Sequence, residues 1–163
     1  MQLDIEIEAP WPATVEWEQL ALDAAEAAAQ VDTTLGNERL CASILFTSDA
    51  EIRSLNSEWR GKDKPTNVLS FPMLERSQLL DLPLEGPPEL LGDIALALET
   101  CTREAQEKGV AVEQHAVHLI VHGLLHLAGH DHETGEAEAE AMEALETKAL
   151  AIMGIADPYA PDL

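Results

Sequence analysis

The segment Ala116-Val-His-Leu-Ile-Val-His-Gly-Leu-Leu-His-Leu-Ala-Gly129 is the most apolar part of the chain. It is too short to cross a bilayer and it carries histidines, so the pattern predicts a helix buried in a protein core rather than a membrane span. We therefore expect this helix inside the fold and no membrane location.

Further strands and helices are predicted on both sides of this segment. The period-2 pattern of residues 2–8 predicts a half-buried edge strand, and Ser48 and Glu51 have the spacing of a capping box at a helix start. The other patterns predict strands at 39–47, 67–71 and 91–98, helices at 14–31, 48–59, 100–108, 112–128 and 135–153, and a loop or flap at 75–89. This mixture favours a single α+β or α/β sandwich, with the order of the strands left open.

The composition fits one compact domain over residues 1–163. A chain of 163 residues that is 46% hydrophobic and 25% charged can bury roughly 70% of its unfolded surface, so it needs no metal to form a core. Residues 1–8 lack the features of a signal peptide, and Cys41 and Cys101 are not spaced as a redox or metal pair. These features favour a cytoplasmic protein with reduced, buried thiols.

The charge of the chain is strongly negative and unevenly distributed. A net charge of -22 argues against broad affinity for nucleic acid, because Lys and Arg supply most of that binding. The basic residues concentrate at Arg53, Arg60, Lys62 and Lys64. The loop from Arg60 to Asn67 could grip a phosphate through the planar guanidinium of Arg60. It could equally be a solvated loop in which Asp63 pairs with a neighbouring lysine.

All six histidines lie between positions 115 and 132. On a helix, His122 and His126 share one face, and Gly129 allows the helix to break so that His132 can fold back toward them. Three imidazoles leave the fourth tetrahedral position open, which is typical of a catalytic zinc site. His115 and His118, taken singly, are better interpreted as hydrogen-bonded core residues.

The spacing of these three histidines is also that of a long zinc-protease motif. That motif requires a Glu directly after the first histidine as general base, and Gly123 stands there. A glycine cannot take a proton from water, so peptide hydrolysis is disfavoured.

Three motifs together resemble the YbeY family of bacterial zinc-dependent endoribonucleases. They are Arg60-Gly-Lys-Asp-Lys-Pro-Thr-Asn-Val-Leu-Ser-Phe-Pro72, Leu91-Gly-Asp-Ile94 and His122-Gly-Leu-Leu-His-Leu-Ala-Gly-His-Asp-His132. The resemblance implies a single α+β domain in which a mixed sheet of about four strands packs with about five helices, with the zinc helix against the sheet. It also implies a single-strand-specific endoribonuclease in the 3′-end maturation of 16S ribosomal RNA and in ribosome quality control. Its partners would be single-stranded RNA, the 16S rRNA precursor, and the small ribosomal subunit with its proteins.

The resemblance assigns roles to individual residues. One Zn²⁺ would bind His122, His126 and His132, and Arg60 would bind phosphate or stabilise the transition state. Lys62 and Lys64 are further candidates for phosphate binding.

Two residues beside the third histidine are candidates for supporting the ligands. The family usually has Tyr at the position of His130, which could support a ligand or act as a weak extra ligand. Asp131 is expected to hydrogen-bond to a ligating histidine. No residue is an obvious general base, and His130 and Asp131 are candidates only because they lie beside the ligands.

A different class of function stays open beside the nuclease. The chain could be a ribosome-assembly factor whose zinc site is weakly used or structural, since its acidic surface could dock on basic ribosomal proteins. The spacing of the ligands would also fit a metalloprotease, but this chain lacks the glutamate that such an enzyme requires.

Overall fold

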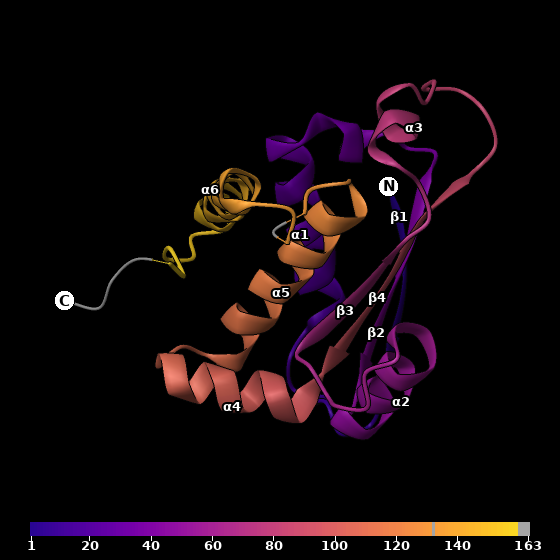
Figure 1. The fold of residues 1–163 in the computed structure, drawn as a ribbon. Coiled ribbons are helices and arrows are strands. Elements are labelled where there is room, and N and C mark those ends of the chain that lie inside the picture. The colour runs from indigo at the N-terminus through magenta and orange to yellow at the C-terminus, as the bar shows by residue number, and fades with distance from the viewer. Residues whose placement is uncertain (132, 160–163) are drawn as a thin grey trace.

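The computed structural model describes residues 1–131 and 133–159, and it arranges them as one mixed sheet with helices on both faces (Figure 1). The strands are β1 (Gln2–Ile7), β2 (Leu40–Thr47), β3 (Val68–Pro72) and β4 (Glu89–Ala97). Their order is β1-β2-β4-β3. The pairs β1–β2 and β2–β4 are parallel, whereas β3 runs antiparallel to β4 at the edge of the sheet.

The helices divide between the two faces of the sheet (Figure 1). Helices α1 (Trp17–Val31), α5 (Val112–Leu127) and α6 (Glu136–Ile152) form one layer, and α4 (Leu98–Lys108) follows β4 directly and packs beside α5. Helix α2 (Asp49–Arg60) lies on the opposite face. The short helix α3 (Arg76–Leu80) lies in the connection from β3 to β4, and a 3-10 turn (Thr33–Gly36) follows α1.

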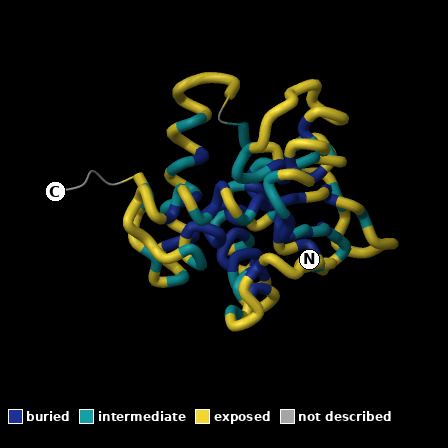
Figure 2. The backbone as a smooth tube through the Cα atoms, turned by 90° about the horizontal axis from the view of Figure 1, so that it is seen from below, coloured by how far each residue is buried: buried dark blue, intermediate teal, exposed yellow. Residues whose placement is uncertain are grey.

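Buried residues gather in the middle of the molecule (Figure 2), and α5 contributes many of the residues of this larger core. Most of its residues are buried, and it packs against α1, β3 and β4. At Gly123 its backbone comes so close to β4 that an added Cβ would lie 3.0 Å from Ile94 Cδ1. On the other face of the sheet, a smaller core joins Ile52 of α2 to Leu69 and Ala95 of β3 and β4. Each face of the sheet thus has its own apolar layer.

The predicted fold class is confirmed: a mixed four-stranded sheet packs with helices, and the histidine-bearing helix lies against it. The expected edge strand is β1. The expectation that residues 75–89 form only a loop is wrong, because α3 adds a sixth α-helix within the described residues. Glu75 and Gln78 form a capping box that starts α3, and the prolines that suggested a loop come after its end.

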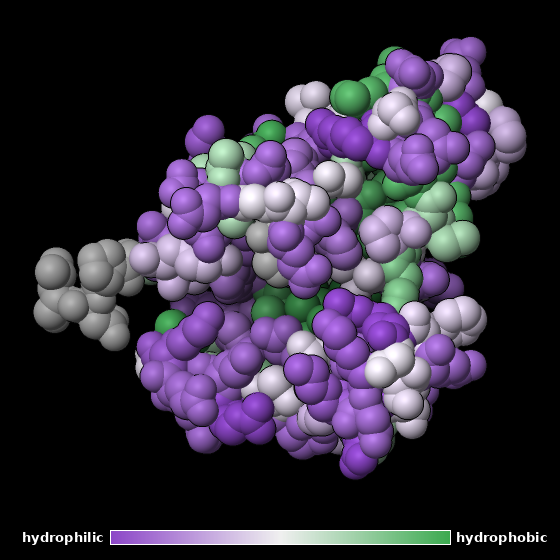
Figure 3. All heavy atoms as spheres, in the orientation of Figure 1, coloured by the Kyte–Doolittle hydropathy of each residue, from purple (hydrophilic) through white to green (hydrophobic). Residues whose placement is uncertain are grey.

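The surface in the view of Figure 1 is mostly hydrophilic, and hydrophobic residues show in the hollow at its middle (Figure 3). No helix among the described residues is long and apolar enough to cross a membrane. Cys41 and Cys101 are free thiols, as expected, but only Cys101 is buried, whereas Cys41 of β2 is half-buried. Burial, with a smaller contribution from the nearby Glu104 charge, raises the pKa of Cys101 to about 12.

Candidate functional site

The predicted ligands His122 and His126 lie one turn apart on α5, between the edge strand β3 and helix α6. The Nδ1 atom of His122 is 3.2 Å from Glu146 Oε1 of α6. The Nδ1 atom of His126 contacts Ser70 Oγ of β3. When each Nδ1 carries a proton toward its oxygen partner, each Nε2 holds the lone pair that a metal requires. The donor set therefore suits zinc, which binds imidazole nitrogen.

The third predicted ligand, His132, lies outside the residues that the structure describes. The chain leading to it turns as expected, since α5 ends at Leu127 and Gly129 adopts a φ of 99°. An added Cβ at Gly129 would lie 2.8 Å from Arg76 Cβ, so this turn has room only for glycine.

Glu146 is the centre of the hydrogen bonds behind His122. Its side chain is only 1% exposed, and its Oε1 also accepts from His118 Nε2 at 2.9 Å and from Tyr159 Oη at 3.0 Å. Burial alone would raise the pKa of this carboxyl, but the hydrogen bonds from His118 and His122 lower it to about 2. Glu146 is therefore an ionised acceptor that holds the ring of His122 in one orientation.

Sequence reasoning did not assign this role to Glu146. Its signal was present, because Glu146 falls on the buried stripe of α6 with Met142, Ala149 and Leu150. A lone carboxylate in an apolar stripe needs a hydrogen-bond donor nearby. Ser70, the other contact of the histidine pair, carried no such signal.

The interpretation of His115 and His118 as hydrogen-bonded core residues is confirmed. Both are buried, and His115 Nε2 lies 2.8 Å from Glu104 Oε1. Burial, the largest influence, lowers the pKa of His115. Glu104 Oε1 also accepts from Asn67 Nδ2 at 2.9 Å. Asn67 ends the loop that begins at Arg60, called the basic loop below, so this hydrogen bond ties the end of the loop to α4.

The two candidates for supporting the ligands make other contacts in the described part of the chain. His130 Nε2 lies 2.8 Å from Asp32 Oδ2 at the end of α1. Asp131 Oδ1 accepts from the backbone amide of Glu133 at 2.8 Å and so stabilises the turn. Arg76 completes this region by donating to Asp32 Oδ2 at 2.7 Å and to the Ala128 carbonyl at 2.9 Å.

The basic loop is held firmly at its start. Arg60 is the last residue of α2, and Gly61 ends the helix with a φ of 69°. The buried Asn56 donates to the Lys64 carbonyl at 2.9 Å, and its own carbonyl accepts from the Lys62 amide at 3.2 Å. The loop is thus anchored by Asn56 at one end and by Asn67 at the other.

The alternative that Asp63 pairs with a lysine is wrong. Its carboxylate makes a two-point contact with Arg53 of α2, at 2.8 and 3.1 Å. Within residues 1–131 and 133–159, the side chains of Arg60, Lys62 and Lys64 are exposed and make no hydrogen bond or ion pair. Three cations therefore stay available for an anionic ligand.

Arg60 makes no direct contact with the histidine pair in the described structure. The two parts are linked through β3, since the basic loop leads into this strand and its Ser70 touches His126. Gly123 faces Ile94 of β4, so a glutamate at that position would meet the core. The geometry gives no place for the base of the zinc proteases.

Comparison with known proteins identifies relatives over nearly the whole chain. The model of the family described as "Endoribonuclease YbeY" matches residues 5–154. A protein of Erythrobacter litoralis named endoribonuclease YbeY is 63% identical over 159 residues, which cover 98% of either chain. A protein of the same name from Novosphingobium aromaticivorans is 60% identical, and the match covers 97% of this chain and 95% of the relative.

A solved structure shares the fold. The solution structure of TM1509 from Thermotoga maritima superposes with a TM-score of 0.58 and covers 98% of this chain and 100% of its own. The sequences are 23% identical, so this likeness bears on the fold alone.

Proposed function

This chain belongs to the endoribonuclease YbeY family and is therefore an RNA-cleaving hydrolase; we propose that it depends on zinc and cleaves single-stranded RNA. We further propose that it acts in the cytoplasm on the 16S rRNA precursor, in 3′-end maturation and in ribosome quality control. The small ribosomal subunit and its proteins would be its partners.

The observation that carries the zinc proposal is the fixed orientation of two imidazoles. Glu146 and Ser70 engage the Nδ1 atoms of His122 and His126, and this supports metal binding through the two Nε2 atoms. His132, after the Gly129 turn, would be the third ligand. Zinc, when bound, would supply a Lewis acid for a phosphoryl oxygen and would lower the pKa of a water molecule.

The residues of the chain would contribute binding and charge. The guanidinium of Arg60 can engage two phosphate oxygens at once and oppose the negative charge that grows during phosphodiester cleavage. Lys62 and Lys64, on the anchored loop, would hold neighbouring phosphates. Glu146 accepts from three donors, so it orients His122 and is not available as a general base.

The alternative of a ribosome-assembly factor has one observation in its favour. The net charge of -22 suits docking on basic proteins better than wide contact with RNA. In that case the zinc site would be structural or weakly used, and the basic loop would be the only part facing RNA.

The test is the zinc content of the purified chain together with cleavage of a single-stranded RNA and of a matched duplex. We expect about one zinc per chain, cleavage of the single strand only, and loss of both metal and cleavage in His126→Ala. His115→Gln is the matched control, because it changes a histidine of the same helix outside the predicted ligand set. Circular dichroism checks that each variant is folded.

Two outcomes would count against the proposal. Cleavage that survives in His126→Ala would point to a contaminating ribonuclease. A folded chain that binds ribosomal subunits, yet cleaves RNA no faster than Arg60→Ala, would favour the assembly factor.

A further inference from the structure

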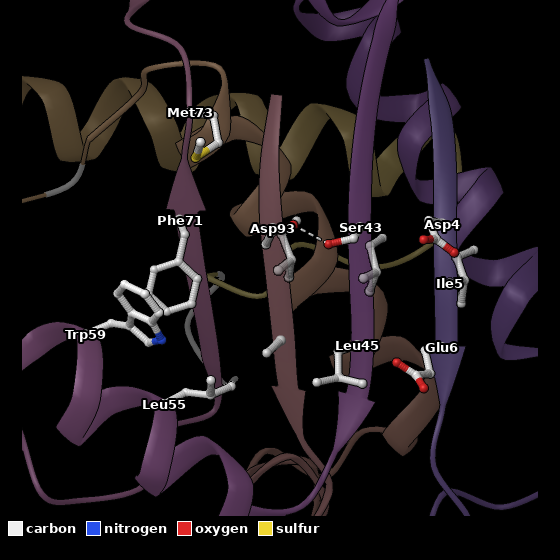
Figure 4. Close-up of a pocket in the computed structure, with 13 residues that line it drawn as sticks. Asp4, Ile5, Glu6, Ser43, Leu45, Leu55, Trp59, Phe71, Met73 and Asp93 are labelled. Atoms are coloured by element: carbon white, nitrogen blue, oxygen red, sulfur yellow. Dashed lines mark hydrogen bonds between the residues drawn. The ribbon is translucent and has the colours of Figure 1, made fainter. Parts of the chain in front are cut away.

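A groove of about 930 Å³ lies on the face of the sheet that α5 does not cover. Strands β1, β2, β4 and β3 form its floor, and α2 forms its wall (Figure 4). The end beside α2 is apolar and is lined by Leu55, Trp59 and Phe71. The far end, on β1, carries the carboxylates of Asp4 and Glu6, whereas Asp93 of β4 lies beside Phe71, its cross-strand partner. The groove therefore has two ends of different chemistry.

Trp59 is unusual among the tryptophans of the chain. Trp11 and Trp17 are each only 2% exposed, whereas Trp59 is 67% exposed. A large aromatic side chain left in water is common where a surface binds a planar ligand. Its ring lies at the mouth of the groove, on the side of Phe71 (Figure 4).

Each of the two aromatic residues is adjacent in sequence to a residue of the proposed site, one to the phosphate-binding candidate Arg60 and one to Ser70, which contacts the predicted ligand His126. Trp59 directly precedes Arg60 at the end of α2, and Phe71 directly follows Ser70 of β3. Side chains alternate between the faces of a strand, so Ser70 contacts His126 on one face while Phe71 lines the groove on the other. Because β3 is an edge strand, a single RNA strand can pass from one face to the other around it.

We propose that Trp59 and Phe71 form a subsite that stacks an unpaired base of the RNA substrate. Stacking on aromatic side chains is the usual way in which proteins bind unpaired bases, and it tolerates any base. The inference rests on the proposed preference for single-stranded RNA, because a base within a duplex cannot enter the groove. It goes further by placing a part of the substrate away from the reacting phosphate.

The charges around the groove fix the path of the RNA. The phosphates would follow Arg60, Lys62 and Lys64, whose side chains have no other partner among the described residues. Asp4 and Glu6 would repel phosphates from the far end, and Asp93 would repel them from the floor of the groove beside Phe71. The apolar end can therefore take a base while the backbone stays over the basic loop.

The kinetic test uses substitutions of Trp59 with cleavage of a single-stranded RNA oligonucleotide. We expect Trp59→Ala to raise KM about five- to 100-fold, the loss typical of one stacked base, with kcat little changed. A contact away from the reacting phosphate is made equally in the ground and transition states, so its loss appears in KM. Trp59→Phe should restore most of the affinity, whereas Trp59→Leu, apolar but not aromatic, should not.

A control separates stacking from a general loss of exposed apolar surface. Leu84 is 79% exposed and does not line the groove, so Leu84→Ala should leave KM unchanged. Since Trp59 is mostly exposed, its variants should keep the thermal stability of the wild type.

A second, direct readout is tryptophan fluorescence. Because Trp11 and Trp17 are buried, a change in emission when RNA is added reports on Trp59. EDTA is present in this experiment to prevent cleavage. We expect quenching by single-stranded RNA in the wild type and none in Trp59→Phe. In a series of RNAs that each lack one base, we expect the quenching to be lost when the missing base is at one or two particular positions.

The inference and the proposed function fail differently. A wild type that does not cleave single-stranded RNA would contradict the proposed function. A wild type that cleaves it, with the same KM in Trp59→Ala and no quenching, would overturn the stacking subsite. If the groove instead bound a basic, apolar peptide that left RNA cleavage untouched, it would be a surface for a protein partner.

Discussion

At the scale of single residues, one buried carboxylate links the core to the proposed metal centre. Glu146 accepts from His118, His122 and Tyr159 through the same oxygen. These donors come from α5 and from the segment after α6, so the orientation of His122 depends on how three parts of the chain pack. Residues that hold a metal-binding histidine in this way commonly affect metal affinity strongly.

We predict that Glu146→Gln lowers zinc affinity about 10- to 100-fold, because a neutral amide holds the His122 ring less firmly than an ionised carboxylate. Competition with a chromogenic chelator measures this affinity. Glu140→Gln is the matched control, since Glu140 lies on the same helix and is exposed. Equal zinc affinity in the two variants would contradict the role given to Glu146.

For Arg60 we predict a loss of activity without a loss of stability. Arg60→Ala should reduce kcat by about 10²–10³, the usual effect of removing one charge-stabilising donor. Arg60→Lys should recover only part of it, because lysine lacks the two-point geometry of arginine. Since Arg60 is exposed, the midpoint of thermal unfolding should stay that of the wild type; a lower midpoint would indicate a structural role instead.

The histidine pair could be predicted from sequence, but the partners of its Nδ1 atoms could not, although the stripe of α6 marks Glu146 as a buried carboxylate that needs a donor. His122 and His126 are four positions apart on one helix, so helical geometry alone places them together. Their contacts Ser70 and Glu146 are far away in sequence. These contacts depend on which strand forms the edge of the sheet and on how α6 crosses α5, and neither follows from local patterns.

At the scale of elements, the close approach of β3, β4 and α5 depends on Gly92. Its φ is 152°, and an added Cβ would lie 2.4 Å from the Phe71 carbonyl oxygen and 2.7 Å from Leu127 Cδ2. The register of β2 with β4 also shifts beside this residue, between Cys41 and Ala42. A side chain at this position would force apart the elements that carry Ser70 and His126.

We predict that Gly92→Ala destabilises the chain by about 2–3 kcal/mol, from overpacking together with backbone strain. Urea unfolding measures the change. Gly36→Ala should have little effect, because an added Cβ at Gly36 would meet nothing within 4 Å. Similar unfolding midpoints for the two variants would show that the sheet can adjust at Gly92.

The elements differ in how well sequence predicts them. Strands β1 and β2 and the long helices have clear periodicity over many residues, and their predicted bounds agree with the structure within a few positions. The five-residue α3 is shorter than any periodic signal, and only its capping box marks it. The antiparallel edge position of β3 comes from long-range pairing, which periodicity does not encode.

At the scale of the whole molecule, the charge distribution leaves a small area that is suited to bind RNA. The chain has a net charge of -22, yet Arg60, Lys62 and Lys64 stand together on one anchored loop. We predict a shallow salt dependence for RNA binding, with a slope of about -2 in a plot of log affinity against log salt, since each neutralised phosphate of a single strand contributes about -0.7. Replacing Lys62 with Ala should make the slope about 0.7 less steep.

This slope is measured by fluorescence anisotropy of a labelled RNA over a range of NaCl concentrations. A much steeper slope would mean that basic residues outside the loop also contact phosphate. Arg103→Ala is a suitable control, because Arg103 lies on α4 and is exposed.

The stability of the whole molecule against acid should depend on a contact among three distant segments. Asp32, after α1, accepts from Arg76 of α3 and contacts His130 in the turn beyond α5. Burial alone would raise the pKa of Asp32, but the hydrogen bonds with His130, Thr34 and Arg76 outweigh it and hold the pKa far below 3.8. A lowered carboxyl pKa contributes stability that is present above the unfolded value and is lost as pH falls through the folded value.

We therefore predict that Asp32→Asn destabilises the chain by about 1–3 kcal/mol near neutral pH, the usual cost of losing hydrogen bonds to a buried charge. The difference from the wild type should shrink as pH falls below the unfolded pKa of 3.8, because the carboxyl of the unfolded wild type then takes up a proton that the folded chain binds only at lower pH. Urea unfolding of both chains at a series of pH values measures this difference.

The matched control is Asp23→Asn. It lies on the exposed side of α1, where Gln19 donates to Asp23, and it should change stability far less. A difference that stayed constant down to the acid-unfolding limit would mean that Asp32 acts through its shape rather than its charge.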